Sequence, residues 1–426
     1  MKLDLTDMLF ALSFALDKAE SEVLGVDTGH CRRVSYIALL MAQEAGFREE
    51  ELRDFIGCCL LHDNALSEYI REELSDSVVL QNLPVKRSGL TESKMDVIHH
   101  HHCVVGEQNI RFLPFHTDVK DVILYHHENA DGSGVLGQTA AETPLKSQIL
   151  HLADMMDITS QLPSMTAAEF ETFCTWVRNQ TGRLFSEQVT ELFFQAVSFD
   201  KIANLKDRQI LSYLRENLRT AVVDYSNEEI RDLAGMFAKI VDYKSTFTQT
   251  HSRGVAEKAE TMARYYGFDD EKTIRYYFAG AMHDIGKLVI SNDILEKAGK
   301  LTNDEFAEMK RHAAATYQIL SQVKDIPDIV RWASNHHEKL NGTGYPQGLA
   351  AESLSFEEQL MACVDIYQAL TEPRPYRNGM SHEESIQIML DMARKGDLNE
   401  RVVQDMNTVM ASLHCTADDT VDRICD

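Results

Sequence analysis

Histidine and aspartate residues recur in the second half of the chain at spacings that suit metal ligands. Imidazole nitrogens and carboxylate oxygens are donor atoms that divalent transition ions take from proteins. The set is larger than one ion requires, and two ions about 3.5–4 Å apart would use all of it and share a water. Its members are His251, His283, Asp284, His312, His336, His337 and Asp365. These residues predict a dinuclear metal centre.

A lone histidine or a lone His-Asp pair indicates little, because most histidines lie at the surface or are satisfied within a core. The pair His283-Asp284 differs because the apolar segment GAMHDIGKLVI surrounds it. A buried carboxylate without a partner is costly, and a bound metal ion removes that cost. The setting of this pair therefore favours metal binding over chance.

The first half of the chain contains the same residue types in the same order. Two intervals are identical in both halves: 32 residues from the first histidine to the His-Asp pair, and 24 from the third histidine to the His-His pair. Between these two intervals the first half has an insertion of 11 residues. Such a repeat indicates a tandem duplication. It predicts a second metal site formed by His30, His62, Asp63, His102, His126, His127 and Asp154.

The composition indicates an all-α protein with two domains. The 426 residues are enough for two domains of about 200 residues each. Only 8 prolines and 21 glycines interrupt long stretches with apolar residues at helical spacing. We predict two tandem helical bundles, at 1–200 and 226–426, joined by a helical connector at 201–225.

The net charge of −25 argues against a polymeric nucleic acid as partner, because such a partner requires a basic surface. A small anionic substrate stays compatible, since metal ions and a few cations reverse the potential inside one pocket. The 8 cysteines form no CxxC pair. The first 20 residues resemble an amphipathic helix rather than a signal peptide, and no run of about 18 apolar residues occurs. We therefore expect a cytoplasmic protein without a membrane-spanning segment.

Three segments of the second half resemble the HD-GYP phosphodiesterases. They are HDIGK from His283, HHEKLNGTGYP from His336 and VDIYQALTEPRPYR from Val364. The resemblance covers about 200 residues, the size of one domain. It implies an HD-domain fold, two or three metal ions, and hydrolysis of cyclic di-GMP or a related cyclic dinucleotide to a linear product, with removal of a terminal phosphate afterwards. The tandem layout is similar to bacterial enzymes that degrade 3′,3′-cyclic GMP-AMP.

The resemblance also implies roles for individual residues. Asp284 and Lys287 would be catalytic, with Asp284 bridging both ions and Lys287 contacting a phosphate oxygen. One ion would bind His251, His283 and Asp365, and the other His312, His336 and His337. Iron or manganese suits this donor set best, and nickel, zinc or magnesium is also compatible. The substrate would contact Lys287, Gly344, Tyr345, Gln368, Arg374 and Arg377, while the loop around Tyr345 could alternatively dock a protein partner.

Three residues of the second half depart from the family pattern. Phe247 replaces a glutamate of members with three metals, so we expect two ions. Gln368 replaces a common aspartate, and its amide shifts the expected base preference away from guanine. Asn341 replaces an aspartate with little expected effect.

The first half departs further. It has Leu66 in place of the lysine, and Val135 and Leu136 in place of Tyr-Pro. We therefore expect its site to bind metal, to turn over poorly and to serve a regulatory or structural role.

Two other functions compete with this prediction. An HD phosphohydrolase of ordinary nucleotides would share the metal site. The loop that contains Gly344-Tyr345-Pro346, called the GYP loop below, argues against it. A non-catalytic signalling scaffold would bind partners through that loop, and the intact ligand set with Lys287 argues against it.

Overall fold

The computed structural model describes residues 1–24, 29–65, 92–160, 162–203, 205–218, 222–244, 250–297, 299–373 and 378–421. The contacts divide the chain into two compact units. The first unit comprises Asp4–Val223, and the second unit comprises Met1–Leu3 together with Asp224–Asp426. We describe each unit by itself.

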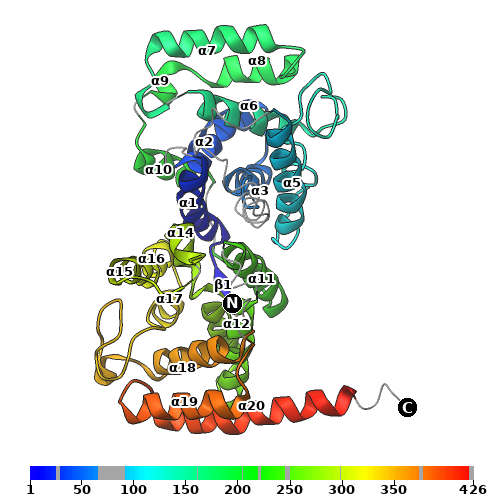
Figure 1. Cartoon of the computed structure of the whole chain (residues 1–426). Coiled ribbons are helices and arrows are strands. Elements are labelled where there is room, and N and C mark those ends of the chain that lie inside the picture. The colour runs from blue at the N-terminus through cyan, green and yellow to red at the C-terminus, as the bar shows by residue number, and fades with distance from the viewer. Residues whose placement is uncertain are drawn as a thin grey trace. The chain divides into compact units, whose positions relative to one another are not determined.

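Helices form nearly all of the regular structure (Figure 1). The first unit contains α1 (Leu5–Leu24), α2 (His30–Glu44), α3 (Glu49–Leu60), α5 (Glu92–Ile110), α6 (Leu145–Thr159), η2 (Leu162–Ser164), α7 (Ala167–Gln180), α8 (Glu187–Ala196), α9 (Phe199–Ile202) and α10 (Asp207–Leu218). The second unit contains α11 (Asn227–Tyr243), α12 (His251–Tyr265), α13 (Asp270–Met282), η3 (Ile285–Val289), α14 (Asn292–Leu295), α15 (Asn303–Met309), α16 (Arg311–Leu320), α17 (Pro327–Ser334), η4 (Ala351–Ser353), α18 (Phe356–Thr371), α19 (His382–Arg394) and α20 (Glu400–Val421). The only strands in the described ranges are β1 (Lys2–Leu3) and β2 (Val223–Asp224), which pair with each other. The predicted all-α class is confirmed.

Helix α2 forms the centre of the first unit. Every residue from His30 to Ala42 is buried, as expected for a helix that is covered on all sides. It packs against α1, α3, α6, α8 and α10. This packing fixes His30, the first residue of α2, inside the unit.

The core of the second unit is built around α12 and α13. These two helices pack against each other, α12 also packs against α18, and α13 packs against α11 and α17. The short η3 packs against α16, and α19 lies beside α20 (Figure 1). None of the helices in the described part of the chain is both long and apolar enough to cross a lipid bilayer.

The amino terminus and the predicted connector do not follow the predicted division of the chain. The ammonium group of Met1 donates hydrogen bonds to the Tyr225 carbonyl (2.7 Å) and the Asp224 carboxylate (3.1 Å), so the first residues belong to the second unit. Within the predicted connector, α10 buries Ile210 and Leu214 and packs against α2. Helix α10 is therefore part of the first unit, whereas Asp224 and Tyr225, at the end of the predicted connector, belong to the second unit. Independent folding of 1–200 and 226–426 stays a prediction.

A buried glutamate joins the end of α17 to the start of α18. Glu358 forms a capping box with Ser355 at the start of α18. Its carboxylate also accepts hydrogen bonds from Arg331 (3.0 and 3.1 Å) and from the Asn335 amide. Because Asn335 directly precedes His336, this network fixes where the His-His pair begins.

Gly286 allows η3 to approach α16 closely. A side chain at this position would collide with the His312 carbonyl and the Thr316 amide. The Gly286 N–H instead donates to the Thr316 hydroxyl (3.1 Å), which donates to the His283 carbonyl (2.9 Å). The glycine of HDIGK thus brings His312 next to the His-Asp pair.

We expect Gly286→Ala to lower the free energy of unfolding by about 1–3 kcal/mol, because α16 must move away from η3. Gly235→Ala is the matched control, since Gly235 lies exposed in α11 with no atom near an added methyl group. The control should be neutral or stabilising by about 0.5–1 kcal/mol. Urea unfolding of both variants measures the difference, and equal midpoints would contradict the role of Gly286.

Candidate metal centre

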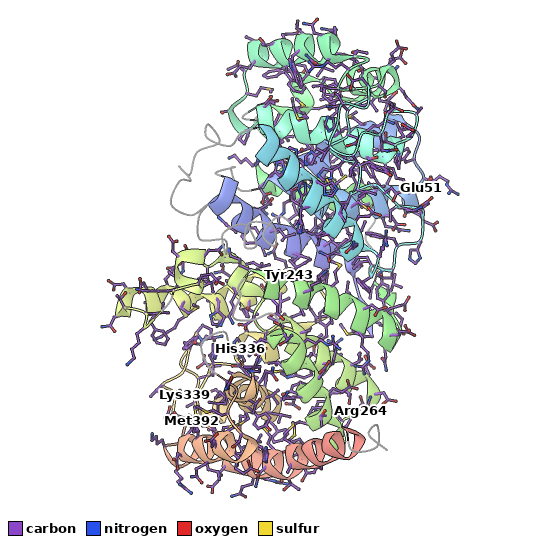
Figure 2. All side chains as sticks on the ribbon, turned by 45° about the vertical axis from the view of Figure 1, so that its right-hand side comes forward. Glu51, Tyr243, Arg264, His336, Lys339 and Met392 are labelled. Atoms are coloured by element: carbon purple, nitrogen blue, oxygen red, sulfur yellow. The ribbon has the colours of Figure 1, made fainter. Side chains whose placement is uncertain are left out.

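The structure brings the seven predicted ligands of the second unit together. They come from separate elements: the start of α12, the turn after α13, α16, the turn after α17, and α18. Six are buried and His337 is partly exposed; His336 is labelled among the side chains in Figure 2. Two sets of three donor atoms lie within 4.8 Å of one another, His251 with His283 and Asp365, and His312 with His336 and His337.

The Asp284 carboxylate lies between these two sets. Its Oδ2 is 3.1 Å from His283 Nε2 and 3.8 Å from His251 Nε2. Its Oδ1 is 3.5 Å from His312 Nε2 and 3.9 Å from His336 Nε2. Each oxygen therefore faces one set, which is the geometry that a bridging ligand requires.

Asp365 faces the centre from α18. Its Oδ1 is 3.1 Å from His251 Nε2 and 3.7 Å from His283 Nε2. Its Oδ2 is 3.6 Å from His337 Nδ1. The assignment of all seven side chains as ligands stays a prediction, and the distances are compatible with it.

Hydrogen bonds on the far side of the rings orient the histidines for metal binding. His283, His312 and His336 each place Nδ1 at 2.6–2.7 Å from a backbone carbonyl of the preceding turn. A carbonyl only accepts, so Nδ1 carries the hydrogen and Nε2 carries a lone pair directed at the centre. The Nε2 atoms of His312 and His336 are only 3.4 Å apart, where two lone pairs repel unless a cation lies between them.

Two further atoms support the fit to a metal. His283 Nε2 and Asp284 Oδ1 are buried and have no hydrogen-bond partner within the described residues. A buried polar atom without a partner is costly, and coordination of an ion removes that cost. The donor set of the second unit therefore fits divalent metal ions.

Burial and neighbouring charges set the protonation of the ligands. Burial lowers the pKa of His337 to about 3 and the pKa of His336 well below its usual value, so both rings are neutral donors. For Asp284, burial favours the neutral acid, but the charges of His283 and Lys287 outweigh burial and hold its pKa well below the usual range. Burial lowers the pKa of His251, but hydrogen bonds to Asp365 and Glu372 outweigh burial and raise it to about 9. Asp284, His336 and His337 are thus in the forms that bind metal, whereas His251 would release a proton on binding.

Glu372 supports His251 and was missed from the sequence. Its Oε2 is 3.0 Å from His251 Nδ1, and its Oε1 accepts a hydrogen bond from the Thr250 hydroxyl (2.6 Å). Carboxylates behind a metal-binding histidine fix its tautomer and orientation. Glu372 could have been predicted from the sequence by its position seven residues after Asp365, because this spacing of two helical turns places both residues on the same face.

Lys287 approaches the centre from η3. Its ammonium nitrogen is 2.5 Å from Asp284 Oδ2, and 18% of its side chain is exposed. The lysine thus supplies positive charge at the edge of an otherwise acidic site. Its contact with a substrate phosphate stays a prediction.

The GYP loop is anchored by Glu338. The Glu338 carboxylate accepts hydrogen bonds from the backbone N–H groups of Gln347 (2.7 Å) and Leu349 (2.9 Å). A side chain at Gly344 would collide with the backbone of residues 337–339, so this glycine is required by the loop itself. The ring of Tyr345 lies 4.8 Å from that of His337, beside the metal ligands. The substrate contacts of Gly344 and Tyr345 stay predictions.

Gln368 is buried on α18, and its amide already has a partner. Its Oε1 accepts a hydrogen bond from Lys258 Nζ (2.6 Å), and a side chain at Gly254 would collide with this amide. A contact between Gln368 and a base stays a prediction. The predicted substrate residues Arg374 and Arg377, as well as Phe247, lie outside the described residues.

The first unit assembles its seven predicted ligands in the same way. Asp63 again lies between two sets, with Oδ2 3.3 Å from His62 Nε2 and Oδ1 3.5 Å from His102 Nε2. Asp154 Oδ1 is 3.2 Å from His30 Nε2. The remaining predicted ligands, His126 and His127, each form close ring contacts with His102. This centre repeats the arrangement of the second unit.

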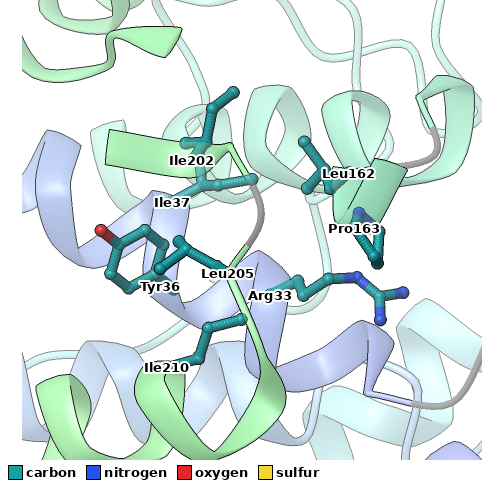
Figure 3. Close-up of a pocket in the computed structure, with 8 residues that line it drawn as sticks. All are labelled: Arg33, Tyr36, Ile37, Leu162, Pro163, Ile202, Leu205 and Ile210. Carbon is teal, nitrogen blue, oxygen red and sulfur yellow. The ribbon is translucent and has the colours of Figure 1, made fainter. Parts of the chain in front are cut away.

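The surroundings of the first centre differ. Asp157 takes the place of Glu372, with Oδ2 2.7 Å from His30 Nδ1, and Arg33 donates two hydrogen bonds to Asp157 (2.6 and 2.9 Å). Arg33 lines a small pocket with Tyr36, Ile37 and residues of η2, α9 and α10 (Figure 3). The loop after His127 is anchored by Glu128, although it carries Val135 and Leu136 in place of Tyr-Pro. Leu66 lies outside the described residues.

One family model of the HD domain matches residues 28–158, and another HD-domain model matches residues 235–401. One match lies in each unit. The chain belongs to the HD-domain family. HD domains are metal-dependent hydrolases, in agreement with the two centres.

This tandem HD protein is a homologue of the HD-GYP phosphodiesterases. It is 29% identical over 411 residues to 3′3′-cGAMP-specific phosphodiesterase 1 of Vibrio cholerae, a match that covers 94% of this chain and 90% of the relative. It is also 29% identical over 425 residues to 3′3′-cGAMP-specific phosphodiesterase 3 of the same organism, and this match covers 90% of this chain and 90% of the relative. A cyclic di-GMP phosphodiesterase of Pseudomonas aeruginosa is 36% identical over 146 residues, 34% of this chain and 35% of the relative.

A solved structure supports the fold of this tandem HD protein. The crystal structure of a cyclic GMP-AMP-specific phosphodiesterase of V. cholerae matches with a TM-score of 0.61 and 22% sequence identity. The match covers 96% of this chain and 98% of the other. The two-bundle architecture is therefore shared along the whole length.

We expect Glu372→Gln to weaken metal binding by the second centre by about 10–100-fold, because an amide orients His251 less well than a carboxylate. Glu352→Gln, at an exposed position in η4, is the matched control. Competition with a metal-binding dye measures both affinities in the full chain. Equal affinities in the two variants would contradict the role of Glu372.

Proposed function

We propose that the second unit hydrolyses one phosphodiester bond of 3′,3′-cyclic GMP-AMP to give a linear dinucleotide. The observation that carries the proposal is the Asp284 carboxylate, which faces one histidine set with each oxygen, beside the cationic Lys287. Such a centre suits a small substrate with charged phosphates, despite a net charge of −25.

The architecture favours cyclic GMP-AMP over cyclic di-GMP. The relatives that match across both units are named as 3′3′-cGAMP-specific phosphodiesterases. The cyclic di-GMP phosphodiesterase of P. aeruginosa matches only about a third of this chain. Two relatives that match along both units are thus named for the mixed dinucleotide, and this supports it as the substrate.

We further propose that the second centre holds two divalent ions, iron or manganese. His251, His283 and Asp365 would hold one ion, His312, His336 and His337 the other, and Asp284 both. When bound, two such ions acidify a shared water and stabilise charge on a phosphate. The residues of the chain orient the ions, and Tyr345 and Lys287 border the space beside them.

Other predictions accompany this proposal. Removal of a terminal phosphate from the linear product, a protein partner at the loop around Tyr345 and a cytoplasmic location remain predictions. A purely non-catalytic scaffold is less compatible with the two histidine sets around Asp284 and the neighbouring Lys287 than a hydrolase is.

We expect Asp284→Ala to reduce cleavage of 3′,3′-cyclic GMP-AMP on the order of 1000-fold or more, since it removes the residue that faces both ligand sets. Asp63→Ala is the matched control, because Asp63 has the same position in the first unit. This control should retain most of the activity. Mass spectrometry of the products after addition of Mn²⁺ or Fe²⁺ measures both variants.

The substrate is tested in the same assay with cyclic di-GMP. Faster cleavage of cyclic di-GMP would contradict the substrate, and activity in Asp284→Ala that is lost in Asp63→Ala would contradict the assignment of the second unit. Absence of turnover in a metal-loaded wild-type chain would favour the scaffold.

A further inference from the structure

The first unit has donor side chains that the second unit lacks at the corresponding positions. Counted from the third histidine of each set, Cys103 corresponds to Ala313, and His99 corresponds to Met309. Cys103 is 2% exposed and belongs to a group of four donors within 4.8 Å of one another, with His102, His126 and His127. The second unit has only the three histidines in the matching group.

The three histidines have the spacing of one coordination shell. His102 Nε2 is 3.3 Å from His126 Nε2 and 3.1 Å from His127 Nε2. Ligand atoms about 2.0–2.1 Å from a tetrahedral ion are about 3.3 Å apart. The observed distances therefore agree with a single small ion between these rings.

The orientation of the His126 ring also favours an ion. Its Nδ1 lies 2.6 Å from the Ile123 carbonyl and must carry the hydrogen, so its Nε2 directs a lone pair at His102 Nε2. Burial lowers the pKa of His126 to about 3, so the ring is a neutral donor. A cation between these nitrogens would compensate the lone pairs that face each other.

Cys103 lies where it can complete this shell. Its Sγ is 3.9 Å from His102 Nε2 and 3.5 Å from the ring nitrogen Nδ1 of His126. Because that Nδ1 already donates to Ile123, it offers the thiol no lone pair. For metal–sulfur and metal–nitrogen bonds of about 2.3 and 2.0 Å, the sulfur and nitrogen ligand atoms lie about 3.5 Å apart. The distance to compare is the 3.9 Å between Cys103 Sγ and His102 Nε2. The thiol therefore lies within reach of an ion bound to His102.

We propose that the first unit binds a thiophilic metal ion, with Zn²⁺ as the best match, through His102, His126, His127 and the thiolate of Cys103. On binding, the thiol releases its proton to solvent and sulfur binds the ion. Imidazole with thiolate is a donor set that zinc takes in structural sites. The second centre offers nitrogen and oxygen donors in its matching groups, so the two units would select different ions.

Cobalt substitution tests the thiolate directly. Co²⁺ bound to a thiolate absorbs in the near ultraviolet by charge transfer from sulfur, whereas Co²⁺ bound to nitrogen and oxygen alone does not. The full-length chain loaded with Co²⁺ should show this band, and Cys103→Ala and Cys103→Ser should lose it. Cys174→Ala, at a buried cysteine of α7, is the matched control and should keep the band.

Metal content tests the site independently of hydrolysis. Elemental analysis after exposure to Zn²⁺ and dialysis should show one zinc fewer per chain in His102→Ala than in the wild-type chain. The double variant Asp284→Ala/His102→Ala should likewise hold one zinc fewer than Asp284→Ala alone. Absence of the charge-transfer band in the wild-type chain, or its persistence in Cys103→Ala, would overturn the thiolate ligand. Equal zinc content with and without His102 would overturn the site. Neither the charge-transfer band nor the zinc content depends on turnover, so failure of the proposed hydrolysis would not contradict the proposed zinc site.

Discussion

The buried carboxylate of Asp284 is the constraint on which the second unit depends. An anion without compensation in this position would be costly, and the charges of His283 and Lys287 beside it hold its pKa well below the usual range. The packing of the second unit therefore positions Lys287 and the histidine ligands around this carboxylate. Gly286 lets η3 approach α16, Glu358 fixes the turn before His336, and the backbone carbonyls behind the histidines set their tautomers. A core arranged in this way holds the donor atoms in the positions that bound metal ions would use.

The two units hold the first histidine of each set, His30 or His251, with different supporting residues. In the first unit, His30 is held by Asp157, which is itself paired with Arg33. In the second unit, the corresponding positions carry Gln368 and Gly254, and Glu372, directly after the end of α18, supports His251. The change is coupled, because the Gln368 amide occupies space that a side chain at Gly254 would need. Duplication thus preserved the ligands while the residues behind them diverged together.

The loops after the His-His pairs show the same separation of scaffold and chemistry. Glu338 and Glu128 anchor these loops through backbone N–H groups, and a glycine is sterically required at Gly344 and Gly134. The tyrosine of the loop, Tyr345, lies next to the ligand His337 in the second unit, whereas the first unit has Val135 at the corresponding position. The first unit therefore retains the shape of the loop without the side chain that would face a substrate, whereas Cys103 gives its centre a donor of a different kind.

The sequence alone determined the helical class and the duplication, and it predicted both ligand sets, because residue types and their intervals are properties of the chain in one dimension. It could not determine the partners that come from distant segments. Glu372 lies 121 residues from His251, Lys258 lies 110 residues from Gln368, and Met1 pairs with Tyr225 across 224 residues. Helix α10, within the connector predicted at 201–225, likewise became part of the first unit only through its packing on α2. These contacts follow from which apolar faces pack together, and that is decided by the tertiary structure.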